Sequence, residues 1–108
     1  MEDHSQISIE ELVKISDKLT STYFQSRDLY SLLVLALLTI TQYSREKRHL
    51  TTTLRIELTI TFLPDLLLHL FNNKMISEEE YKILSDEINK QSARIPFILQ
   101  SYIYACVW

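Results

Sequence analysis

Three histidines and one cysteine are the side chains in this chain that are best able to do acid–base, nucleophilic or metal chemistry. They are His4, His49, His69 and Cys106. No two of the histidines lie within a helical turn and no H-x-x-x-H spacing is present, so the usual zinc-binding motifs are missing. A nucleophilic cysteine needs a histidine beside it in space, and sequence spacing provides none. An enzyme built on this chain would need one of these residues to converge with a carboxylate in a cleft.

The acidic run Glu78-Glu79-Glu80 is a second place where chemistry is conceivable. A calcium loop would need alternating Asp or Asn ligands and a glycine at its turn, and the chain contains no glycine. The same absence excludes phosphate-binding loops and nucleophile elbows. The favourable electrostatics of acids at a helix amino end explain this run without a site. We therefore predict no catalytic residue, no metal ligand, no cofactor and no small-molecule substrate, with His69 hydrogen-bonded at the core or its boundary.

Composition restricts the class of protein. The 108 residues are 46% hydrophobic with a net charge of −3, which predicts a single domain over residues 1–108 with a real core. The mild negative charge argues against a nucleic-acid partner. A lone cysteine excludes an intrachain disulfide and favours a reducing compartment. The acidic amino terminus does not fit a secretory signal, so we expect a cytoplasmic protein.

The amino-terminal half predicts two helices after a frayed stretch, residues 1–7. Ser8 and Glu11 have the spacing of a capping box for the first. The second opens at Ser26 or Asp28 and covers residues 29–43, which are apolar almost all round and therefore predict a central core helix. Fifteen residues fall short of the roughly 20 that span a bilayer, although insertion of residues 29–43 into a membrane is the alternative. The basic cluster 44–49 ends this helix.

The apolar residues of segment 49–63 fit both the two-residue period of a strand and the spacing of a helix. Apolar residues alternate with polar ones as in a strand, yet Leu50, Leu54, Leu58 and Phe62 also lie four apart as in a helix. We favour the helix and keep an α+β alternative with a hairpin within residues 32–62. Pro64 is expected to break the chain here.

Three further helices are predicted beyond this break, over residues 64–71, 77–89 and 95–105. Ser77 and Glu80 form a capping box at the start of the middle one. The carboxyl-terminal aromatics Tyr102, Tyr104 and Trp108 are expected in the core, with an exposed anchor for a partner as the alternative. The fold class is therefore all-α, a compact antiparallel bundle of five to six helices.

Residues 49–104 resemble the first four helices of the caspase-recruitment domain (CARD) family of the death fold. The resemblance rests on four elements. They are the run Phe62 to Leu67, the helix start MISEEEY at 75–81, the linker NKQ at 89–91 and the run Arg94 to Leu99. The chain departs from the family because it ends at Trp108 before the last two CARD helices and has about 48 residues ahead of the matching segment.

The resemblance implies a non-enzymatic protein–protein interaction module that binds another CARD-like domain or itself through oppositely charged helix faces. The acidic set would be Asp65, Glu78, Glu79, Glu80, Asp86 and Glu87. The basic set would be Arg45, Lys47, Arg48, Arg55, Lys90 and Arg94. An adaptor, decoy or inhibitor is the expected role. The alternative is a small membrane-associated helical protein.

Overall fold

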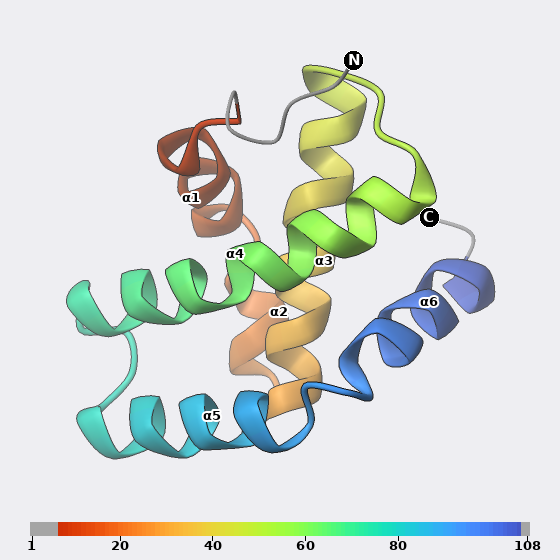
Figure 1. Cartoon of the computed structure of the whole chain (residues 1–108). Coiled ribbons are helices and arrows are strands. Elements are labelled where there is room, and N and C mark those ends of the chain that lie inside the picture. Colours follow the sequence, from red (N-terminus) through yellow and green to blue (C-terminus); the bar gives the residue numbers. More distant parts are fainter. Residues whose placement is uncertain (1–6, 107–108) are drawn as a thin grey trace.

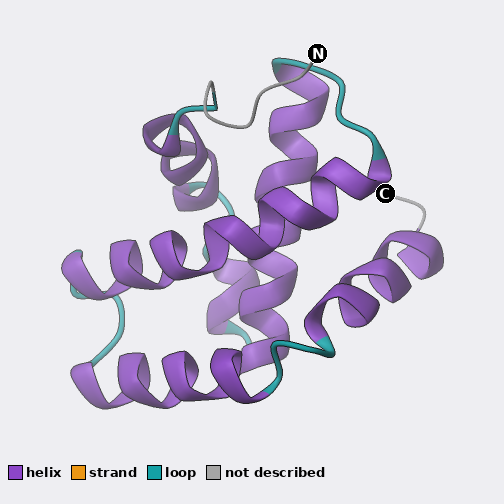
Figure 2. Ribbon diagram, in the orientation of Figure 1, coloured by secondary structure: helices purple, strands orange, loops and turns teal. Residues whose placement is uncertain are grey.

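The computed structural model describes residues 7–106, and this part of the chain folds into helices joined by short turns (Figures 1 and 2). The helices are α1 (Ile9–Asp17), α2 (Ser21–Phe24), α3 (Leu29–Glu46), α4 (Thr52–Asn72), α5 (Glu78–Lys90) and α6 (Ile95–Cys106). No strand occurs among the described residues. The all-α prediction is confirmed. The hairpin alternative within residues 32–62 was wrong, because this segment forms α3 and the first half of α4.

Helix α3 is the centre of the bundle. It packs against α1, α2, α4, α5 and α6, and Figure 1 shows it passing behind α4. Its apolar residues point in nearly every direction and are fully buried at Leu32, Leu33, Leu35, Ala36, Leu37 and Ile40. Burial of each such side chain contributes about 1.5–3 kcal/mol, so this helix provides much of the core. None of the helices described here has the length and apolar character needed to cross a membrane.

Side-chain caps begin α3, α4 and α5, and in α4 the Thr51 hydroxyl accepts a hydrogen bond from the Leu54 amide at 3.2 Å. The Asp28 carboxylate accepts a hydrogen bond from the Ser31 amide at 2.8 Å, and the Ser31 hydroxyl lies 3.0 Å from the Asp28 amide. This reciprocal pair fixes the start of α3 at Asp28 and not at Ser26. The Ser77 hydroxyl likewise accepts from the Glu80 amide at 3.1 Å to begin α5. The capping box predicted at Ser8 was wrong, because that side chain makes no cap hydrogen bond.

Pro64 does not break the chain, contrary to our prediction. Helix α4 runs from Thr52 to Asn72 with Pro64 inside it, although an interior proline costs about 3 kcal/mol. Leu63, on one side of the proline, and Leu66 and Leu67, on the other, are all buried. Since burial of each such side chain contributes about 1.5–3 kcal/mol, packing on both sides outweighs the lost hydrogen bond.

A tight turn returns the chain from α4 to α5. Lys74 adopts a left-handed conformation (φ 60°). Its amide donates to the Phe71 carbonyl at 3.0 Å, and the Met75 amide donates to the Leu70 carbonyl at 2.9 Å. These two bonds form a Schellman motif, in which glycine usually occupies the Lys74 position. The turn lays α5 antiparallel to the second half of α4 (Figure 1).

Two features of the amino-terminal part were not predicted from the sequence. Helix α2 is only four residues long, which is too short to produce a recognisable period. Residues 1–6 of the stretch expected to fray lie outside the described part. Ile7, the last residue of the stretch that was expected to fray, is buried against the core.

Candidate functional site

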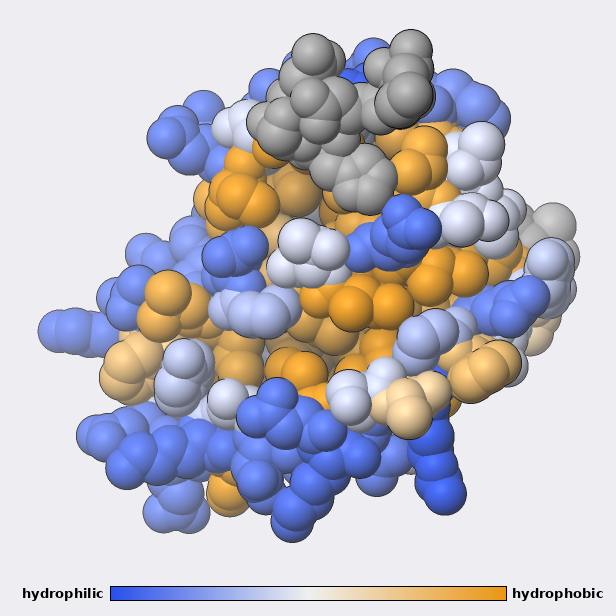
Figure 3. All heavy atoms as spheres, viewed as in Figure 1, coloured by the Kyte–Doolittle hydropathy of each residue, from blue (hydrophilic) through white to orange (hydrophobic). Residues whose placement is uncertain are grey.

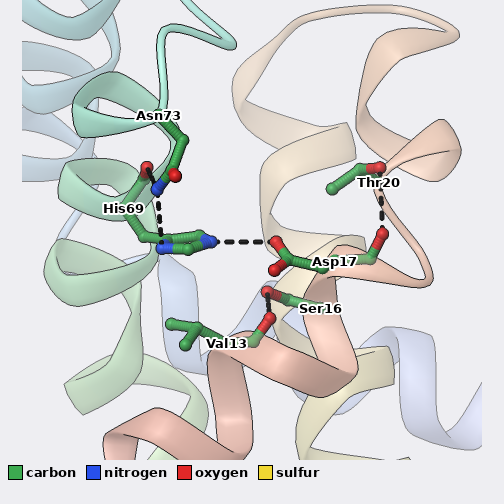
Figure 4. Close-up of polar contacts among 6 residues, drawn as sticks. All are labelled: Val13, Ser16, Asp17, Thr20, His69 and Asn73. Carbon is green, nitrogen blue, oxygen red and sulfur yellow. Dashed lines mark hydrogen bonds and ion pairs between the residues drawn. The ribbon is translucent and has the colours of Figure 1, made fainter.

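His69 is the one predicted chemical side chain that meets a carboxylate within the described part of the chain (Figure 4). Its Nε2 atom lies 2.8 Å from an Asp17 carboxylate oxygen, which links α4 to the end of α1. Its Nδ1 atom lies 3.1 Å from the Asn73 side-chain nitrogen, which also donates to the His69 carbonyl at 2.8 Å. The amide nitrogen can only donate, so Nδ1 accepts and Nε2–H donates to Asp17.

This geometry forms a clamp between two helices, in which both ring nitrogens of His69 are hydrogen-bonded within the fold. The neighbouring hydroxyls of Ser16 and Thr20 donate to the carbonyls of Val13 and Asp17, at 2.9 and 3.4 Å (Figure 4). His49 is exposed in the loop before α4, and the side chain of Cys106 lies outside the described residues. The prediction that His69 is a hydrogen-bonded boundary residue is confirmed.

Glu80 forms the second polar cluster, which joins α5 to the segment around α2. Its carboxylate accepts a hydrogen bond from the buried Tyr23 hydroxyl, 57 residues away, and pairs with the Arg27 guanidinium at 2.8 Å. Arg27 also lies over the Phe24 ring, 5.0 Å from its centroid. Glu80 had been predicted to face a partner. In the structure only 19% of its side chain is exposed and both carboxylate oxygens are engaged within the fold.

The electrostatics of this cluster follow from burial and hydrogen bonding. Partial burial disfavours the Glu80 carboxylate, but the hydrogen bonds from Arg27 and then Tyr23 outweigh it and hold the pKa of Glu80 below its usual range. Burial, followed by the hydrogen bond to Glu80, raises the pKa of the Tyr23 phenol far above its usual value. Glu80 is therefore ionised and Tyr23 neutral at physiological pH, as a stable hydrogen-bonded cluster requires.

Of the remaining acids of α5, Glu78, Glu79 and Asp86 are exposed and Glu87 is half-buried, and they differ in what they contact. Glu78 pairs with Lys82 and Asp86 pairs with Lys90, each at 3.1 Å along the helix. Such exposed pairs contribute little to stability. Among the described residues, Glu79 and Glu87 have no ion-pair partner. They lie two turns apart on the same side of α5, with Ile83 between them.

A shallow depression of about 380 Å³ lies at this side of α5, where the helix meets the start of α3. Ile83, 52% exposed, and the buried Leu84 form its apolar part. Asp28, Glu79 and Glu87 supply carboxylates around it. We call Glu79, Ile83, Glu87 and Asp28 the α5 acidic face. Sequence reasoning missed Asp28, which is remote in the chain, and Ile83, whose outward position only the packing of α5 reveals.

The other predicted partner-binding residues do not join this face. Asp65 is exposed on α4 and Arg55 is half-buried near the start of the same helix. Arg94 lies in the turn before α6, and Arg45, Lys47 and Arg48 lie where α3 ends. In Figure 3 the most hydrophilic residues gather along the edge formed by α5, while apolar residues are visible along α4 and beside it. The structure therefore separates the predicted charged sets into several places.

Helix α6 has an outer face of a different kind. Phe97 is 70% exposed and Tyr104 is 68% exposed, although the core was the expected place for the carboxyl-terminal aromatics. That prediction was wrong for Tyr104, whereas Tyr102 is half-buried against the core. Trp108 lies outside the described residues. Ile95, Leu99 and Ile103 bury the inner face of this helix.

Comparison with known proteins identifies no matching family model, no matching curated protein and no matching solved structure. The resemblance to the CARD family therefore rests on the sequence pattern alone.

Proposed function

We propose that this protein is a protein–protein interaction module that binds a basic segment of a partner protein through the α5 acidic face. The observation that carries the proposal is the pair of carboxylates without ion-pair partners, Glu79 and Glu87, on either side of the exposed Ile83. On the rest of α5 the outward acids are matched by lysines of the same helix. On α5 this face combines unmatched charge with an exposed apolar side chain.

The face is held in place before any partner arrives. Leu84 anchors the inner side of α5 in the core. Glu80, next to Glu79 in the chain, ties the start of the helix to Tyr23 and Arg27. A surface that is already ordered loses less conformational entropy on binding, and this favours affinity. The long-range contacts of Glu80 thus support the function without touching the partner.

The chemistry of the face selects a lysine- or arginine-rich partner. The aliphatic part of a Lys or Arg side chain can pack on Ile83 while its cationic end reaches Glu79, Glu87 or Asp28. Arg27 does not oppose this attraction, because Glu80 already neutralises it. Complementary charges of this kind steer the encounter and set specificity. An acidic partner, or a second copy of the same face, would be repelled.

The CARD resemblance implies the same class of function, with a partner of the same helical type. A module that presents an acidic helix to a basic one fits an adaptor, a decoy or an inhibitor equally. These roles, like membership of the family, stay predictions.

The proposal is tested with a fluorescent amphipathic helical peptide of lysine and leucine as the probe, measured by anisotropy at low and high salt. We expect saturable binding that weakens with salt. Glu79→Lys should weaken it by about 3- to 10-fold, which corresponds to roughly 0.7–1.4 kcal/mol. Ile83→Ser should weaken it without a change in the salt dependence.

The matched control is Asp65→Lys, which makes the same charge change at an exposed position of α4. It should leave binding nearly unchanged. Equal weakening by Glu79→Lys and Asp65→Lys would show that only net charge matters, and this would contradict the proposed surface. Glu80 is unsuitable for this test, because its reversal would disturb the fold.

A further inference from the structure

The outer face of α6 is neutral and aromatic along its whole length. The twelve residues Ile95–Cys106 contain no charged side chain. Phe97 and Tyr104, both about two-thirds exposed, are seven residues apart and therefore lie two turns apart on one side of the helix. Gln100 and Ser101 are exposed between them. We call Phe97, Gln100, Ser101 and Tyr104 the α6 aromatic face.

We propose that two copies of this protein pair through the α6 aromatic face, with their α6 helices antiparallel across a two-fold axis between Gln100 and Ser101. In this arrangement Phe97 packs on the partner's Tyr104, and the reciprocal contact follows from the symmetry. The small polar residues at the axis allow the helices to approach. Aromatic pairs of this kind contribute about 0.5–1.5 kcal/mol beyond the area that they bury.

Charge identifies a second copy as the occupant. Each molecule has a net charge of −3, so two copies repel each other least when they meet through a surface without acids, and α6 provides one. Arg94, exposed just before the helix, would lie near the carboxyl end of the partner's α6, where the unpaired carbonyls carry partial negative charge. A parallel arrangement would instead bring the two Arg94 side chains together. The antiparallel pair is therefore the complementary one.

Other occupants fit the face less well. A charged partner would find no opposite charge on α6. A membrane surface usually attracts helices through a row of lysines and arginines, and α6 has none. The inferred surface is also separate from the α5 acidic face, so it does not depend on the proposed binding of a basic partner.

The small area of the α6 aromatic face limits the affinity of the dimer. A helix of twelve residues is about 18 Å long. Two such helices, packed side by side, bury less than the ~1,200 Å² of a standard stable interface. The dimer should therefore be weak, and its population should rise with protein concentration.

Sedimentation velocity of the full chain over a concentration series, with a reducing agent because the chain has one cysteine, tests the proposal. We expect the wild type to shift from monomer toward dimer. Phe97→Lys and Tyr104→Glu should each remain monomeric, because each places two unpaired charges in the interface. The control Ile9→Lys, at an exposed apolar position of α1, should dimerise like the wild type. Circular dichroism checks that all variants fold.

Mixing the two monomeric variants tests the arrangement itself. In the antiparallel pair Lys at position 97 meets Glu at position 104 once, and the other contact is the original Phe–Tyr pair, so the mixture should recover the dimer. Failure of the mixture to dimerise would overturn the antiparallel arrangement. A wild type that stays monomeric at every concentration, or dimers that persist in both variants, would overturn the interface. Binding to phosphatidylcholine vesicles, without dimers and lost in Phe97→Lys, would assign the face to a lipid surface and overturn it too.

Discussion

Helices α5 and α6 are consecutive, nearly equal in length and packed on the same helix, α4, yet their outer faces are opposites. Seven of the thirteen residues of α5 are charged, whereas none of the twelve residues of α6 is. On the inner side the two are alike, because leucine and isoleucine at helical spacing enter one core. In both helices the apolar stripe therefore determines where the helix packs and leaves its outer side open to a separate function. We propose that one outer side binds a basic partner and the other a second copy.

The largest loss of stability is expected from mutations in the buried inner faces of α5 and α6, and it shows whether the two faces are equivalent. Leu84 in α5 and Leu99 in α6 are both buried. Replacement of a buried leucine by alanine removes contacts and leaves a cavity, at about 2–5 kcal/mol. We expect Leu84→Ala and Leu99→Ala to lower the free energy of unfolding by similar amounts within this range, measured by urea denaturation. An effect below about 1 kcal/mol at either site would show that this helix is only loosely attached.

A smaller loss of stability is expected at Glu80, and it distinguishes this residue from its neighbour Glu79. Glu80→Ala should destabilise the fold by about 2 kcal/mol, because it leaves the buried Tyr23 hydroxyl without its acceptor. Glu79→Ala should change stability by less than about 0.5 kcal/mol, as expected for an exposed residue. Urea denaturation at pH 7 provides the measurement. Equal effects would contradict the assignment of Glu80 to the fold and Glu79 to the surface.

The pH dependence of stability tests whether the ionised form of Glu80 stabilises the fold. The folded-state pKa of Glu80 is below its unfolded value of about 4.3. Its ionised form therefore stabilises the fold above that pH, and this contribution is lost as the pH falls through the lower folded pKa. The stability difference between wild type and Glu80→Gln should narrow between pH 6 and roughly pH 3. A constant difference over this range would show that the carboxylate charge is not what stabilises the cluster.

The smallest expected change in stability comes from a mutation in the turn between α4 and α5. A left-handed conformation costs a non-glycine residue about 1 kcal/mol, and Lys74 adopts one in a chain without glycine. Lys74→Gly should therefore stabilise the protein by up to about 1 kcal/mol, seen as a rise in Tm. Asn72→Gly, within α4, serves as the control and should destabilise. A destabilising Lys74→Gly would contradict the Schellman geometry.

Much of the fold was predictable because its signals are local. Asp28 and Ser77 identified the starts of α3 and α5 through capping chemistry. Apolar spacing identified α5 and α6 and the central place of α3. The continuation of α4 through Pro64 was not predictable, because it depends on burial on both sides of the proline and outweighs a local rule. Helix α2 gave no periodic signal at four residues.

The candidate surfaces were predictable only in part. The sequence indicated that acids of α5 would face outward, which holds for Glu78, Glu79 and Asp86, whereas Glu87 is half-buried. It could not show that Glu80 turns inward, because its partners Tyr23 and Arg27 are 57 and 53 residues away. The clamp between His69 and Asp17 joins residues 52 positions apart and was hidden for the same reason. Such contacts depend on how the helices pack, which no local spacing records.

The division between a charged binding face and a neutral pairing face is tested most directly by sedimentation velocity at low and at high salt. We predict that dimers formed through α6 persist or strengthen at high salt, since no charge pair spans the aromatic contacts and salt screens the repulsion between the acidic molecules. Glu79→Lys should leave them unchanged and Phe97→Lys should abolish them. Dimers that dissociate at high salt and are lost in Glu79→Lys would contradict pairing through α6, because they would show that the charged face of α5 pairs the copies.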